Sequence, residues 1–142
     1  ADAEAFEQLY SGRLWSLLSW QQLTDFWARI DRGAGWYLYA VGEPLPSAPA
    51  AAAEVERFIA ETDALLRKEH HHDYCGIVYA DDLDAPRLVK IYDPNNLGSS
   101  CGTGKHPHPP GWIMSRVLPV ALERPGPLPE ARKRWWRSLF GS

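Results

Sequence analysis

The stretch YCGIVYADDLDAPRLVKIY, residues 74–92, indicates the fold class more directly than any other part of the chain. Its two apolar runs, Tyr74–Ala80 and Leu88–Tyr92, are rich in the β-branched and aromatic residues that strands prefer. The acidic segment 81–86 between them suits a hairpin or a slightly longer connection. Strands that follow one another, instead of alternating strictly with helices, favour an α+β fold over a doubly wound sheet.

Two further strands are expected outside this stretch, at WYLYAV (36–41) and at WIMSRV (112–117). In the run 88–92, we expect Lys90 to face solvent. Val89 and Ile91, which alternate with it, would then face the core.

Helical periodicity accounts for most of the remaining chain. One apolar stripe from Phe6 to Leu18, with a break at Ser11-Gly12, and a second from Trp20 to Ile30 predict helices in the first third. Ser19-Trp20-Gln21-Gln22 fits the capping-box pattern, with serine as the N-cap. A helix from Ala50 to about Lys68 is the clearest element. Its apolar face would consist of Val55, Phe58, Ile59, Thr62, Leu65 and Leu66.

The expected order is helix, strand, helix, strand, strand, strand, helix. It predicts an α+β fold in which a three- to four-stranded, mostly antiparallel sheet packs against amphipathic helices. Residues 1–124 would form a single domain. Residues 125–142 would add a proline-rich spacer and a basic helix, about 130–140, docked on that domain.

The composition is that of a globular protein, with 45% hydrophobic and 23% charged residues in 142. Fifteen basic and eighteen acidic residues give a net charge of −3, which argues against nucleic-acid binding through overall charge. No apolar run is long enough to span a bilayer, and two cysteines cannot form a disulfide framework, so we expect a soluble, cytoplasmic protein.

The loop from Pro94 to Gly111 is the most distinctive segment, because structureless loops of this length are uncommon in compact domains. A phosphate-binding loop is excluded, since Gly104-Lys105 is followed by histidine and by prolines instead of Ser or Thr and a helix. A ligand or partner site in this loop would use Asp93, Asn95, Asn96, Cys101 and Lys105.

A zinc site is the sharper possibility for the same loop, because zinc prefers four thiolate or imidazole ligands. The candidate ligands are Cys75, Cys101, His106 and His108, although their spacing matches no known zinc pattern. Cys75 and Cys101 could instead form a disulfide, or Cys101 could act as a nucleophile near His106. The sequence leaves these alternatives open, and Cys75 alone fits a buried apolar position.

The C-terminal segment combines basic residues with adjacent tryptophans, a composition typical of helices that dock on a partner. A docking face would use Arg134, Trp135, Trp136 and Arg137. The alternative is that its aromatic residues pack back on the domain itself.

Seven tryptophans in a chain without a catalytic signature favour a small, non-enzymatic accessory or adaptor protein. It would bind a protein partner or a second copy of itself, because one small core rarely encloses so many indole rings. The alternative is a protein or enzyme that binds a metal or small ligand, with its site in the loop from Pro94 to Gly111.

Overall fold

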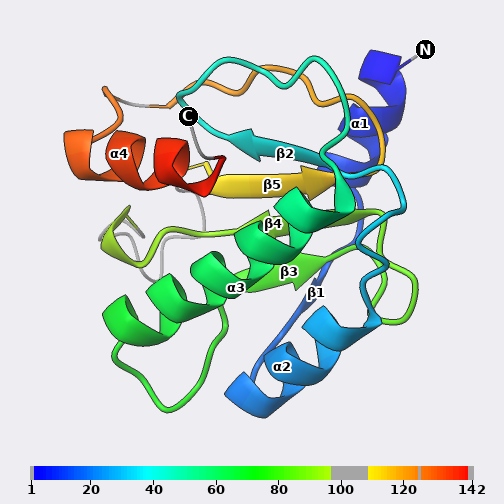
Figure 1. The fold of residues 1–142 in the computed structure, drawn as a ribbon. Coiled ribbons are helices and arrows are strands. Elements are labelled where there is room, and N and C mark those ends of the chain that lie inside the picture. The colour runs from blue at the N-terminus through cyan, green and yellow to red at the C-terminus, as the bar shows by residue number, and fades with distance from the viewer. Residues whose placement is uncertain (1, 97–108, 125, 141–142) are drawn as a thin grey trace.

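The computed structural model describes residues 2–96, 109–124 and 126–140. Four helices are present: α1 (Asp2–Ser11), α2 (Trp20–Arg29), α3 (Ala52–Glu69) and α4 (Glu130–Leu139) (Figure 1). The strands are β1 (Trp15–Ser16), β2 (Tyr37–Ala40), β3 (Val78–Ala80), β4 (Leu88–Ile91) and β5 (Trp112–Ser115), and a short 3-10 helix, η1, spans Pro94–Asn96. The strands form one sheet in the order β1-β3-β4-β5-β2, and every neighbouring pair is antiparallel.

The α+β class is confirmed, but the sheet has five strands instead of three or four. The additional strand is β1, which lies where the apolar stripe predicted helix. The chain leaves α1 at Ser11, and the next position requires glycine, because a Cβ there would lie 2.7 Å from the Gln8 carbonyl oxygen. It then runs beside β3, and the N–H of Leu17 donates to the carbonyl of Val78 at 2.9 Å. Backbone pairing with a distant strand therefore overrides helical spacing in residues 14–18.

The helix predictions for 20–30 and 50–68 are confirmed within one or two residues at each end. The Ser19 hydroxyl accepts a hydrogen bond from the N–H of Gln22 and caps α2, and the Gln22 side chain in turn accepts from the N–H of Leu18. The six residues predicted for the apolar face of the third helix are the six that α3 buries.

Helices α2, α3 and α4 cover one face of the sheet and form the larger core with it (Figure 1). The opposite face carries a smaller cluster, consisting of Phe6 from α1 with Tyr39, Val41, Leu88 and Ile113 from the strands. The segment 117–122 packs on this smaller cluster, so α1 and this segment cover the β4–β5–β2 part of the second face.

The prediction that Lys90 faces solvent is wrong. Val89 and Ile91 face the larger core as expected, but Lys90 is only 8% exposed because α1 lies over its side of β4. Its ammonium nitrogen lies 3.6 Å from the ring centroid of Tyr10 on α1.

The C-terminal helix packs on the rest of the domain. Leu139 is buried, and the Trp135 and Trp136 rings lie 5.2 and 6.1 Å, centroid to centroid, from Trp112 and Phe58. Across the described ranges, no helix is both long and apolar enough to cross a bilayer.

Candidate functional site

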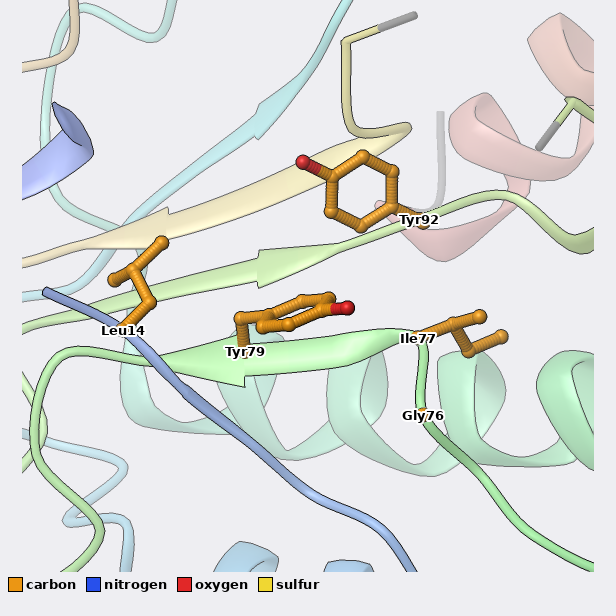
Figure 2. A pocket seen from close by; sticks show the side chains of 5 residues that line it. All are labelled: Leu14, Gly76, Ile77, Tyr79 and Tyr92. Carbon is orange, nitrogen blue, oxygen red and sulfur yellow. The ribbon is translucent and has the colours of Figure 1, made fainter. Parts of the chain in front are cut away.

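A pocket of about 330 Å³ opens on the second face of the sheet, beside the part that α1 covers. We call it the tyrosine pocket. It is lined by Leu14, Gly76, Ile77, Tyr79 and Tyr92. Figure 2 shows the Tyr79 and Tyr92 side chains standing on the side of the sheet away from α3, with Leu14 next to them. The two rings meet edge to face, with centroids 5.7 Å apart and an interplanar angle of 80°.

Strand alternation places these side chains. Val78, Ala80, Val89 and Ile91 face the larger core, so Tyr79 and Lys90, which alternate with them, stand on the second face. Ile77, just before β3, is itself part of the larger core and forms the end of the pocket there. The N–H of Tyr92 donates to the carbonyl of Ile77 at 2.9 Å, so the hydrogen bonds between β3 and β4 continue one residue beyond the start of β3 and the end of β4.

The chain enters this edge at Gly76, whose φ of +70° is a conformation that a residue with a side chain rarely adopts. The N–H of Gly76 donates to the Leu17 carbonyl at 2.8 Å and ties the entrance to β1.

Lys90 does not itself line the tyrosine pocket, but it is the neighbour of two residues that do. It lies directly opposite Tyr79 in the β3–β4 register and two residues before Tyr92, so the three side chains share one face at neighbouring positions. The Tyr10 ring covers its ammonium from the α1 side. Among the described residues Lys90 has no ion pair and no hydrogen bond. The Lys90 nitrogen is not fully enclosed, however, and it retains some contact with solvent.

Burial shifts the ionisation of this group of residues. It lowers the pKa of the Lys90 ammonium to about 8. It also raises the pKa of Tyr10 to about 12, with smaller contributions from Tyr92, Glu7 and Tyr39. The pKa of Tyr92 is likewise raised, first by burial and then by Tyr79. At neutral pH the site therefore holds an amine close to its pKa among phenols that keep their protons.

An amine in these surroundings has two chemical capacities. As an ammonium it is a buried cation that no carboxylate of the described residues pairs with, which favours an anion in the adjoining space. As a free amine it is a nucleophile, as lysines in desolvated, apolar surroundings commonly are.

Two of the loop residues predicted for a ligand site, Asp93 and Asn95, lie elsewhere and belong to an ion-pair network. The Arg132 guanidinium on α4 donates to both Asp93 carboxylate oxygens at 2.8 Å and to Glu69 on α3 at 2.7 Å. The Asn95 amide also donates to Glu69, at 2.6 Å. The hydrogen bond from Arg132 holds the pKa of Glu69 below its usual value. The network joins η1, α3 and α4.

The other predicted loop residues are not brought into a site by the described structure. Asn96 ends η1, and Cys101, Lys105, His106 and His108 lie outside the described residues. Cys75 is fully buried, and burial raises the pKa of its thiol. Within the described ranges no three His, Cys, Asp or Glu side chains form a group that could hold a metal ion.

The four residues predicted for docking divide into two kinds. Arg134 and Arg137 are exposed, whereas Trp135 and Trp136 are half-buried against the domain.

Sequence reasoning did not identify Lys90, Tyr10, Tyr79 and Tyr92 as candidate residues. The one available signal was the strand alternation that places Lys90 and Tyr92 on a common face. That signal does not show that a helix from the N-terminus covers this face. Comparisons with protein-family models, with curated proteins and with solved structures found no match for this chain.

Proposed function

We propose that this protein binds a small anionic molecule with an aromatic or other apolar part in the tyrosine pocket. The observation that carries the proposal is the buried ammonium of Lys90, which has no ion pair among the described residues and stands next to the pocket-lining Tyr79 on the same face of the sheet. Burying a charge without a partner costs several kcal/mol, and such costly groups concentrate at functional sites. A carboxylate or phosphate next to Lys90 would neutralise the charge, and the rings of Tyr79 and Tyr92 would cover the apolar part of the ligand.

Calorimetric titration with benzoate and phenyl phosphate tests this proposal, with benzamide and benzylamine as the neutral and cationic analogues. We expect the anions to bind and the analogues to bind at least tenfold more weakly, because only the anions compensate Lys90. Anion affinity should fall as the pH rises through about 8, since the ammonium then loses its proton.

Lys90→Met should abolish the preference for anions, while the matched control Lys133→Met should retain it. Lys133 lies on α4, over the other face, and pairs with Glu130 at 3.6 Å. Equal affinities for benzoate and benzamide, or full anion binding by Lys90→Met, would contradict the proposal.

A second candidate function is the adaptor role, and the exposed apolar residues at the β1 edge favour it. Trp15, Leu18 and Tyr74 are 48, 62 and 56% exposed. Leu18 and Cys75 are joined by a backbone hydrogen bond of 2.7 Å, which places Leu18 beside the residue that follows Tyr74. The other six tryptophans are buried or packed against the larger core, so Trp15 is the indole ring with most surface left for a partner.

Backbone geometry at this edge supports one way for a protein partner to attach. The N–H of Leu17 points inward to Val78, so the backbone groups of Ser16 point away from the sheet at its open edge. We propose that an extended segment of another protein would pair there and cover Trp15 and Leu18.

Affinity capture from native extract should separate the two functions. Leu18→Lys should lose a partner that the wild-type protein retains, and Leu118→Lys, on a separate exposed segment, should keep it. Identical capture by all three proteins would remove the adaptor role. Sedimentation of the same proteins tests self-association.

A further inference from the structure

We infer that Lys90 forms a reversible imine with small aldehydes that bear a carboxylate. The inference rests on the proposed function, because the aldehyde must enter the tyrosine pocket as the anion does. It adds a covalent activity and a substrate class to a site that would otherwise only bind.

The geometry suits an amine nucleophile. The Lys90 side chain is more than nine-tenths buried, yet its nitrogen remains in contact with solvent. Its one polar or aromatic contact among the described residues is the Tyr10 ring at 3.6 Å, so no hydrogen-bond acceptor or carboxylate holds the nitrogen. The two tyrosine rings beside it are positioned to hold an aromatic aldehyde against the sheet.

Burial also supplies a reactive fraction of the amine. With a pKa of about 8, about one lysine in ten is unprotonated at pH 7. For an ordinary, exposed lysine the fraction is about one in several thousand. Lys90 should therefore react well ahead of the other lysines at neutral pH.

The reaction balances within the site and needs no oxidant or reductant. The lone pair of the amine forms a bond to the carbonyl carbon, and the oxygen takes up the proton that the nitrogen loses, which gives a carbinolamine. The C–O bond then breaks as water leaves, and the nitrogen lone pair forms the C=N bond. The departing oxygen needs a proton. We assign its delivery to the Tyr92 hydroxyl, which lines the pocket and remains protonated at neutral pH. The second proton on nitrogen returns to Tyr92, so one aldehyde and one amine yield one imine and one water.

The test uses the full chain with 4-carboxybenzaldehyde at pH 7.5, reduction by borohydride, and peptide mapping by mass spectrometry. We expect one major adduct, at Lys90, formed at least tenfold faster than at any other lysine and suppressed by excess benzoate. Lys133→Arg should give the same adduct and Lys90→Arg should give none. Tyr92→Phe should slow imine formation about tenfold or more, while its affinity for benzoate changes little.

Labelling spread evenly over the lysines, or none at Lys90, would overturn the inference, and mapping of the wild-type protein decides this even if a variant does not fold. Benzoate binding without an adduct would remove the imine and leave the proposed function. Loss of both would remove both.

Discussion

Replacing Lys90 with methionine should stabilise the protein, although it removes a charged group from the centre of a sheet. Methionine has a similar length and no charge, so it can occupy the same space under Tyr10. Burial lowers the pKa of Lys90 from 10.5 to about 8. Because one pKa unit corresponds to about 1.4 kcal/mol, the buried charge costs the fold about 3 kcal/mol at neutral pH. The lost contact between the ammonium and the Tyr10 ring offsets about 1 kcal/mol of this gain. We therefore expect a net gain of about 2 kcal/mol at pH 7.

The gain should disappear as the pH rises. Below about pH 8 the lysine carries its charge in both the folded and the unfolded state, so the full energetic cost of burying the charge is present. Between 8 and 10.5 the unfolded state binds more protons than the folded state, and the stability of the wild-type protein therefore rises with pH. The methionine variant has no such rise, so the difference between the two proteins should shrink across this range.

Urea unfolding of both proteins at pH 7, 8, 9 and 10 measures this difference. Tyrosine ionisation also affects stability at high pH. Since the pKa of Tyr10 is raised, the stability that its protonated form contributes is lost as the pH rises above about 10. This loss acts on both proteins and largely cancels in the difference between them. A variant that is less stable than the wild-type protein by the same amount at every pH would refute the reasoning. Lys90 would then make stabilising contacts that the structure does not show.

Four further predictions concern the larger core and the docked helix. Arg132→Met should destabilise the protein by about 2–4 kcal/mol, because two partly buried carboxylates lose their cation. The control Arg137→Met, at an exposed position, should change stability by less than about 0.5 kcal/mol. Equal effects of the two substitutions in urea unfolding would contradict a stabilising role of the ion-pair network. The network's contribution should also weaken as the pH falls below 4.5 towards the lowered pKa of Glu69, and Arg132→Met should show less of this acid sensitivity. Thr62→Val should stabilise the protein by about 1 kcal/mol, because the Thr62 hydroxyl is buried without a hydrogen-bond partner among the described residues. A lower melting temperature of the variant would show instead that the hydroxyl makes a hydrogen bond. With the other cysteine replaced by serine, Cys75 should react with a thiol reagent only as fast as the protein opens, and rapid labelling of the folded protein would contradict its burial.

Local patterns in the sequence were sufficient wherever an element depends on its own residues. The six-residue face of α3 and the Ser19 cap of α2 follow from helical spacing and from a hydrogen bond within one turn. The consecutive strands β3 and β4 follow from two β-branched runs joined by a short acidic connection. Residues 14–18 were misassigned because their apolar spacing suits a helix, and their pairing with β3 depends on residues more than sixty positions away.

The sequence by itself determined the α+β class, helices α2 and α3 on the larger core and the direction in which Val89 and Ile91 point. It also determined that Lys90 shares a face with Tyr92. Only the tertiary structure decided whether that face is exposed to solvent or buried, because the helix that covers it, α1, comes from the N-terminal part of the chain. The ionisation of a side chain depends on how much water its neighbours displace, and those neighbours come from three separate segments here. For this reason a lysine that fits a solvated strand by its local pattern is buried in the folded protein and has a lowered pKa.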